Sequence, residues 1–158
     1  MMKKKIVKWG IAIMVSGFII GGSVALYIFN MPHRDVQSTA VDYEKGSTQL
    51  VNEYLQNADA ANEQYLQEEG DSKIIAVTGI VASIDEDMNQ QQVVLLKDSD
   101  QEAGVSCTFM ASTNVNAIKL KKGDRVTIKG VIRSGAGYDE DLEMYEDVIM
   151  EKCDVLQI

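Results

Sequence analysis

The chain has 158 residues, of which 46% are hydrophobic, and its 24 Asp and Glu outnumber its 15 Lys and Arg, which gives a net charge of −9 at pH 7. This length leaves room for one soluble domain beside an N-terminal apolar segment. The acidic balance argues against binding of nucleic-acid phosphates, which relies on clustered Lys and Arg. The two cysteines, at positions 107 and 153, do not have the spacing of a metal-binding pair.

An uncharged apolar run from Trp9 to Phe29 dominates the N-terminus. A hydrocarbon core about 30 Å thick needs about 20 helical residues, so this run is long enough to span a membrane. Lysines 3, 4, 5 and 8 precede it and favour a cytoplasmic N-terminus. We therefore predict a cytoplasmic basic segment over residues 1–8 and a single-pass inner-membrane helix over residues 9–29.

A cleaved signal peptide is the alternative to this anchor, because Ser23, Val24 and Ala25 offer small residues to a signal peptidase. The apolar run continues to Phe29, however, and an uncleaved anchor accounts for all of it. All 24 acids and eleven of the bases follow residue 30, so the remainder carries a charge of about −13. We expect this part to be periplasmic or extracytoplasmic.

Residues 30–46 form a predicted tether, because Pro32 ends the apolar helix and a polar stretch runs from there to Gly46. His33, the only histidine, has no suitable partner beside it for catalysis or metal binding. The following domain is predicted over residues 47–158. Its first element is an amphipathic helix of about five turns with Ser47 as its cap, because apolar residues recur at helical spacing from Leu50 to Tyr65.

From Lys73 onward the pattern changes to strands. Phe109 and Cys107 share the apolar side of one strand and are expected to point inward. A helical or irregular connector covers residues 113–120, a polar loop covers residues 133–147, and the predicted strands are Lys73–Ile84, Val93–Lys97, Val105–Met110, Arg125–Ile132 and Val148–Leu156. Five strands with a glycine inside a long first strand and a connector after the third are typical of an OB-fold barrel. The predicted class is mainly β: a five-stranded OB-fold barrel preceded by an amphipathic helix, with an N-terminal transmembrane helix.

Several segments carry a family resemblance, and they occur in a defined order: Pro32–Asp35, Leu50–Leu55, Ala61–Leu66, Val77–Val81, Val105–Phe109 and Leu120–Gly130. This series resembles the tRNA-anticodon-binding-like (tRNA_anti-like) OB-fold family of bacterial envelope proteins, over roughly residues 31–158. The resemblance implies a helix that precedes the barrel. It implies no particular activity.

The two cysteines allow a disulfide outside the cytoplasm, and they also suit small core positions. The family resemblance implies a cysteine-containing turn after the fourth strand, where this chain has Val131–Gly137 instead. For Cys153 the remaining partner is Cys107, because the third and fifth strands are neighbours in an OB barrel. The geometry that a bridge requires cannot be read from the sequence.

No arrangement of nucleophile and base, paired carboxylates or metal ligands indicates catalysis, and no glycine loop is followed by the lysine and helix of a phosphate site. We therefore expect a non-enzyme without a cofactor. The barrel segment has only Phe109, Tyr138 and Tyr145 as aromatics, too few for the stacking on which single-stranded nucleic-acid binding depends. Nucleic acid is not expected as a partner.

Acidic residues concentrate in two loops, and in an OB barrel both loops are expected near the binding face. They predict one acidic binding rim formed by Asp85, Glu86, Asp87, Asp139, Glu140, Asp141, Glu143, Glu146 and Asp147. Within it, Asp139, Asp141 and Glu143 are the metal-ligand candidates, because calcium takes carboxylate oxygens. The plainer reading is that these are solvated loops.

The sequence thus predicts a membrane-anchored binding or scaffolding module of the bacterial envelope. Its membrane contact is residues 9–29, and its partner is an envelope protein or a small ligand. The alternative is a domain that responds to divalent cations through its acidic loops.

Overall fold

A computed structural model of the chain describes residues 16–17, 20–27, 35–66 and 72–158. The chain forms two compact units, Met1–Arg34 and Asp35–Ile158. In the first unit, residues 16–17 and 20–27 are helical and exposed. None of the helices in the described ranges is both long and apolar enough to cross a membrane. Much of the predicted anchor over residues 9–29, all of residues 1–8 and the start of the tether lie outside the described residues.

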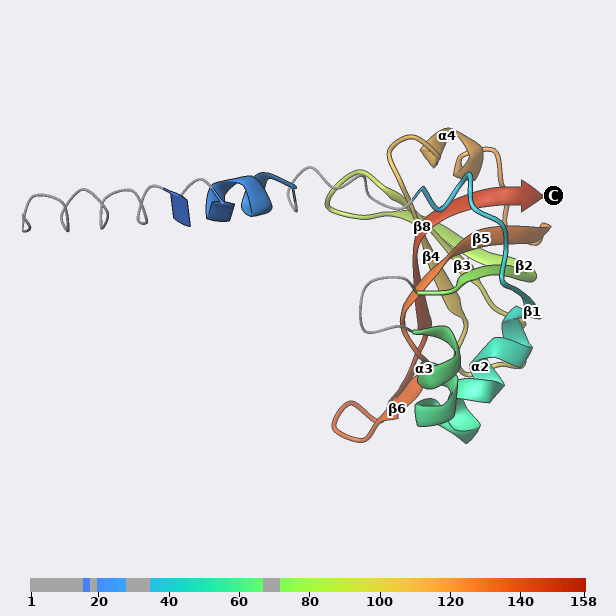
Figure 1. Cartoon of the computed structure of the whole chain (residues 1–158). Helices are drawn as coiled ribbons and strands as arrows, with labels where there is room; N and C mark the ends of the chain where they lie inside the picture. Colours follow the sequence, from blue (N-terminus) through green and yellow to red (C-terminus); the bar gives the residue numbers. More distant parts are fainter. Residues whose placement is uncertain (1–15, 18–19, 28–34, 67–71) are drawn as a thin grey trace, which may run out of the picture. The chain divides into compact units, whose positions relative to one another are not determined.

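The second unit is built on a closed barrel of five strands (Figure 1). The strands are β2 (Ile74–Glu86), β3 (Gln92–Leu96), β4 (Val105–Phe109), β5 (Arg125–Ser134) and β8 (Val148–Gln157). Their order is β2-β3-β4-β8-β5, and a further pairing of β2 with β5 closes the barrel. Only β4 and β8 run parallel among these neighbours. The predicted five-stranded OB-like barrel is confirmed.

Strand β2 is long because it serves two neighbours. Its first half pairs with β5, from Ile74 opposite Val131 to Ile80 opposite Arg125, and its second half pairs with β3. Gly79 lies near the change of partner. A Cβ atom there would stand 2.6 Å from the Ser47 Oγ, so glycine is required because the helical segment approaches the strand closely.

The predicted single helix is two helices, α2 (Ser47–Gln56) and α3 (Ala58–Tyr65). The break falls at Asn57, whose backbone leaves the helical region and whose side chain accepts a hydrogen bond from the Ala60 N–H. Gly46 occupies the N-cap position, so the prediction that Ser47 caps the helix is wrong. Most of the apolar stripe is confirmed, because Leu50, Val51, Tyr54, Ala61 and Tyr65 are buried. Leu55 and Ala58, which the same spacing includes, are exposed.

The described part of the predicted tether is folded onto the barrel, which corrects the prediction for residues 35–46. Strand β1 (Tyr43–Gly46) pairs in parallel with β2, and Val36 is buried. The Lys129 ammonium on β5 donates hydrogen bonds to the carbonyl oxygens of Gln37, at 3.0 Å, and Thr39. Lys129 belongs to the polar side of the predicted strand, yet it is buried because residues 35–42 cover it.

The remaining elements close the barrel and extend it. The connector after β4 contains the short helix α4 (Asn114–Ala117), as predicted. The predicted polar loop contains a hairpin of β6 (Gly137–Asp139) and β7 (Met144–Glu146). In Figure 1, α2 and α3 lie at one end of the barrel and α4 at the other.

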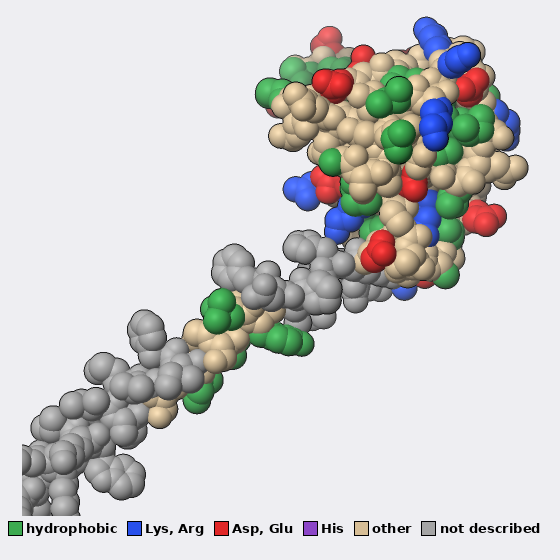
Figure 2. Space-filling view, turned by 90° about the horizontal axis from the view of Figure 1, so that it is seen from above, with side chains coloured by type: hydrophobic (Ala, Val, Ile, Leu, Met, Phe, Trp, Pro, Cys, Tyr) green, Lys and Arg blue, Asp and Glu red, His purple; other side chains and the backbone are tan. Residues whose placement is uncertain are grey.

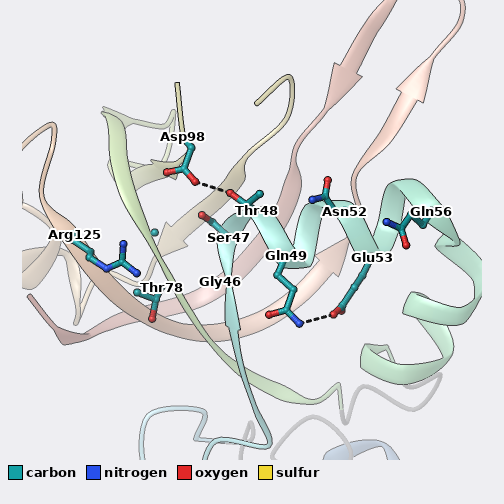
Figure 3. Close-up of a pocket in the computed structure, with 11 residues that line it drawn as sticks. Gly46, Ser47, Thr48, Gln49, Asn52, Glu53, Gln56, Thr78, Asp98 and Arg125 are labelled. Atoms are coloured by element: carbon teal, nitrogen blue, oxygen red, sulfur yellow. Dashed lines mark hydrogen bonds between the residues drawn. The ribbon is translucent and has the colours of Figure 1, made fainter. Parts of the chain in front are cut away.

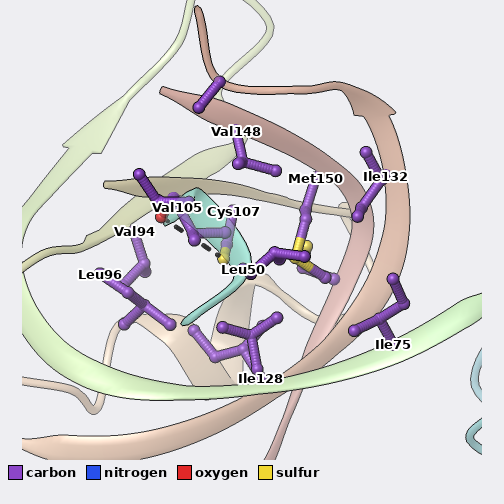
Figure 4. Close-up of a cluster of buried hydrophobic side chains, with 14 of the residues drawn as sticks. Leu50, Ile75, Val94, Leu96, Val105, Cys107, Ile128, Ile132, Val148 and Met150 are labelled. Carbon is purple, nitrogen blue, oxygen red and sulfur yellow. Dashed lines mark hydrogen bonds between the residues drawn. The ribbon is translucent and has the colours of Figure 1, made fainter. Parts of the chain in front are cut away.

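The core lies inside the barrel, with side chains from every barrel strand and from α2 (Figure 4). Cys107 and Phe109 are fully buried, as their alternation predicts. Figure 4 labels Leu50, Ile75, Val94, Leu96, Val105, Cys107, Ile128, Ile132, Val148 and Met150 of this cluster. The same core therefore holds the helix and the barrel together.

Candidate functional site

The two acidic loops lie at opposite ends of β4, so the predicted common rim does not form. Val93 pairs with Thr108, which places the β2–β3 loop beside the end of β4. Val148 pairs with Val105, which places the loop before β8 beside the start of β4. Five strand residues separate the two ends by about 13 Å. The prediction is wrong because β8 runs parallel to β4 while β3 runs antiparallel to it.

Several of the predicted rim carboxylates hold turns instead. The Asp87 carboxylate accepts hydrogen bonds at 2.8 Å from the N–H groups of Asn89 and Gln91, within the β2–β3 loop. At the other end, the Asp147 carboxylate accepts from the Gly104 N–H at 2.6 Å. Asp85 and Glu86 form the end of β2.

The predicted metal ligands form a turn rather than a cation site. The Asp139 Oδ1 accepts hydrogen bonds from the N–H groups of Asp141, at 2.8 Å, and Leu142, at 3.0 Å. Glu143 has a φ of 52° and ends this turn in the left-handed region. Within the described ranges, no three His, Cys, Asp or Glu side chains gather as metal ligands would. Asp139, Asp141 and Glu143 are not brought together.

The hairpin β6–β7 projects from the barrel and exposes large apolar side chains (Figure 1). Tyr138 lies directly opposite Tyr145, with ring centroids 4.9 Å apart. These rings are 52% and 38% exposed, and Leu142 and Met144 are exposed beside them. Carboxylates border this apolar group: Asp139, Glu140, Asp141, Glu143 and Glu146. The hairpin lies within the segment predicted as a polar loop, although the two tyrosines on either side of an acidic turn are a signal for it.

Cys107 and Cys153 lie on neighbouring strands, as expected for the third and fifth strands of the barrel. Both are fully buried free thiols. Burial, and then the neighbouring Cys107 thiol, hold the pKa of Cys153 well above its usual value. A Cβ at Gly130 would stand 2.8 Å from the Cys153 Sγ, so the glycine leaves room for the sulfur. Here the cysteines act as small core residues, and a disulfide between them stays a prediction.

A polar cavity of about 580 Å³ lies beside the start of α2 (Figure 3). Asp98, from the β3–β4 loop, and Arg125, at the start of β5, border it on either side of Ser47. The Asp98 carboxylate accepts a hydrogen bond from the Thr48 hydroxyl at 2.6 Å. The other residues that line the cavity are Gly46, Gln49, Asn52, Glu53, Gln56, Thr78 and Gly79. No local sequence pattern predicts this site, because its residues come from four separate segments.

A charged and aromatic cluster supports the helical side of this cavity. The Lys45 ammonium pairs with the Glu53 carboxylate at 2.8 Å, and the Tyr65 hydroxyl donates to the same carboxylate. Burial alone would raise the pKa of Glu53, but hydrogen bonds from Lys45, Tyr65 and Gln49 together hold it below the usual 4.5. Glu53 is therefore ionised and paired at neutral pH.

The barrel surface carries mixed charges. The face seen in Figure 2, on the side where Figure 1 places α4, shows Lys and Arg interspersed with Asp and Glu. A continuous basic stripe, which a phosphate backbone would require, is not visible on this face.

Three solved structures that are similar to this chain illustrate the range of the comparison. A solved lipoprotein from Klebsiella pneumoniae subsp. pneumoniae MGH 78578, a proposed nucleic acid-binding protein, is 18% identical with a TM-score of 0.52. The match covers 80% of this chain and 100% of that one. An OBody bound to hen egg-white lysozyme is 17% identical over 70% of this chain and 95% of its own, with a TM-score of 0.43. Asparaginyl-tRNA synthetase from Pyrococcus horikoshii is 24% identical over 59% of this chain and 22% of its own, with a TM-score of 0.37.

No curated protein matches the sequence significantly. The tRNA_anti-like family model matches residues 1–141, which is most of the chain. The barrel order, with its parallel β4–β8 pair, agrees with the OB fold that the family resemblance implies. The chain therefore belongs to the tRNA_anti-like family.

Proposed function

We propose that this protein is a membrane-anchored binding module of the bacterial envelope, and that hairpin β6–β7 docks on a protein partner. The anchor is the apolar run over residues 9–29, with the basic residues before it on the cytoplasmic side and the barrel outside the cytoplasm. The lipoprotein nature of the Klebsiella structure supports an envelope location. In this proposal the module is not an enzyme.

The hairpin is the observation that carries the proposal. Tyr138, Tyr145, Leu142 and Met144 expose apolar surface on a two-stranded ribbon outside the barrel. Tyrosine and methionine are enriched in protein interfaces, and tyrosine is enriched among the residues that dominate binding energy. A narrow ribbon with a central tyrosine pair fits a groove in a partner better than a flat surface.

The charge of the hairpin defines the partner. Five carboxylates surround the apolar group, and the span Gly137–Glu146 contains no Lys or Arg. A groove with an apolar floor and a basic rim would complement this pattern, and opposite charges at the rim would speed association. Phosphates would be repelled at the same place, which supports a protein rather than nucleic acid as the partner.

Site-specific photocrosslinking in the native membrane tests this proposal. A photoreactive residue replaces Leu142 in the full-length chain, and the matched control carries it at Met88, which is 96% exposed on the β2–β3 turn. We expect a discrete adduct with another envelope protein from position 142 and not from position 88. Replacing both tyrosines with serine should abolish the adduct, and high salt should weaken it.

Three outcomes would contradict the proposal. These are identical adducts from positions 142 and 88, an adduct that survives the double tyrosine substitution, or an adduct with nucleic acid. Adducts only between copies of this chain would limit the hairpin to self-association.

A further inference from the structure

The first turn of α2, with its backbone N–H groups, lies at the polar cavity. The helix has ten residues, its N-cap is Gly46, and it has neither a side-chain cap nor an acidic residue in its first turn. The N–H groups of a first turn lack intrahelical partners and carry partial positive charge. Gly46, Ser47, Thr48 and Gln49, which form this end, all line the cavity.

Ser47 supplies a second, independent sign of a ligand. The exposed fraction of this side chain is only 4%, and the cavity is the space onto which it opens. In Figure 3 its oxygen points toward the space between Asp98 and Arg125. Among the described residues only the Tyr54 hydroxyl and the Asn62 Oδ1 are fully buried without a partner, so the Ser47 hydroxyl keeps contact with the cavity, where a ligand atom can form a hydrogen bond with it. Gly79 makes the position possible, since any Cβ there would clash with the same oxygen.

Two opposite charges stand on either side of this hydroxyl. Arg125 forms no ion pair with a described residue and presents its guanidinium beside the cavity. The Asp98 carboxylate accepts one hydrogen bond, from Thr48, and a carboxylate can accept several more. The two groups are not paired with each other, so a ligand between them meets both signs of charge.

We propose that this cavity binds a small zwitterion of the α-amino-acid type. Its carboxylate lies between Arg125, Ser47 and the N–H groups that begin α2, and its ammonium group lies against Asp98. Asn52 and Gln56 line the same cavity further along α2 and offer amide groups there. A simple phosphate would be repelled by Asp98, and none of the lining residues is aromatic, so the cavity lacks the stacking surface of a nucleobase site.

Ligand-observed saturation-transfer NMR on the full-length chain in detergent tests this inference. The probe is an equimolar mixture of the twenty protein amino acids, and propionate and ethylamine serve as analogues that carry one charge each. We expect saturation transfer from the protein to at least one of the amino acids, and no transfer to propionate or to ethylamine. Transfer to no amino acid, or equal transfer to propionate, would overturn the inference.

Variants locate the binding. Arg125→Gln and Ser47→Ala should each weaken binding of the identified amino acid about tenfold, because each removes a hydrogen bond to a charged group. Asp98→Asn should reduce the preference for the amino acid over propionate, a change that loss of structure alone would not produce. Arg133→Gln is the control, since that side chain pairs with Glu151 away from the cavity. Unchanged affinity in folded Arg125→Gln would refute the site.

Discussion

Replacing Tyr54 with phenylalanine is expected to stabilise the protein. The Tyr54 side chain is 2% exposed, and its hydroxyl is buried without a hydrogen-bond partner in the described part of the chain. Burial of an unpaired hydroxyl costs about 1–3 kcal/mol. Phenylalanine keeps the ring contacts with Tyr65 and Gly135 and removes this cost. We expect the free energy of unfolding to rise by about 1 kcal/mol and Tm by about 4 °C.

The same substitution has a pH signature. Burial raises the pKa of Tyr54 to about 12, above its usual 10.0. Because the folded-state pKa is the higher one, the stability linked to the neutral hydroxyl is fully present below pH 10 and is lost as the pH rises towards 12. The Tyr54→Phe variant lacks this group, so its stability advantage should grow between pH 10 and 12.

Thermal unfolding of the full-length chain, followed by circular dichroism, measures both effects. Tyr65→Phe is the matched control, because the Tyr65 hydroxyl donates to Glu53. Its loss should lower stability by about 1.5–3 kcal/mol, the opposite sign. A lower Tm for Tyr54→Phe would refute the reasoning and would mean that the Tyr54 hydroxyl is hydrogen-bonded, for example to a buried water.

Three further predictions test the packing and the ion pair. Gly135→Ala should lower stability by about 1–3 kcal/mol in urea unfolding, because its Cβ would stand 2.0 Å from a buried tyrosine ring, whereas Gly137→Ala should have little effect. Lys129→Met should speed hydrogen exchange of residues 35–42, because the ammonium no longer binds their carbonyl oxygens; unchanged exchange would contradict this anchoring. The pKa of Glu53 lies below 4.5, so its contribution to stability is present above pH 4.5 and is lost as the pH falls through the folded-state pKa. The Glu53→Gln variant should therefore lose less stability than the wild type when thermal unfolding is measured at pH values below 4.5. An equal loss in the two proteins would count against the ion pair.

Much of the fold could be predicted because its signals are local. Alternation along Val105–Phe109 reveals which side chains face inward, since successive strand residues point to opposite faces. Helical spacing identifies the buried stripe of α2 and α3 in the same way. Helical spacing does not reveal the break at Asn57, where the backbone leaves the helical region and the Asn57 side chain caps a second helix.

The burial of Lys129 and the positions of the acidic loops depend on pairing between distant segments, which periodicity cannot predict. Lys129 alternates like a surface residue and is nevertheless buried, because residues 35–42 pack over it. The two acidic loops have similar composition, but the direction of β8 relative to β4 separates them.

Of the two candidate sites, local sequence indicates one, and only the tertiary structure assembles the other. The two tyrosines of the hairpin are close in sequence, so their pairing could have been inferred from the turn between them. The polar cavity joins Ser47, Asp98 and Arg125, which no local pattern connects. The sequence by itself determined which faces of each element are apolar and thereby the barrel, because burial of those faces drives folding. Only the tertiary structure decided which charges meet, because that depends on the register and direction of strands distant in the chain.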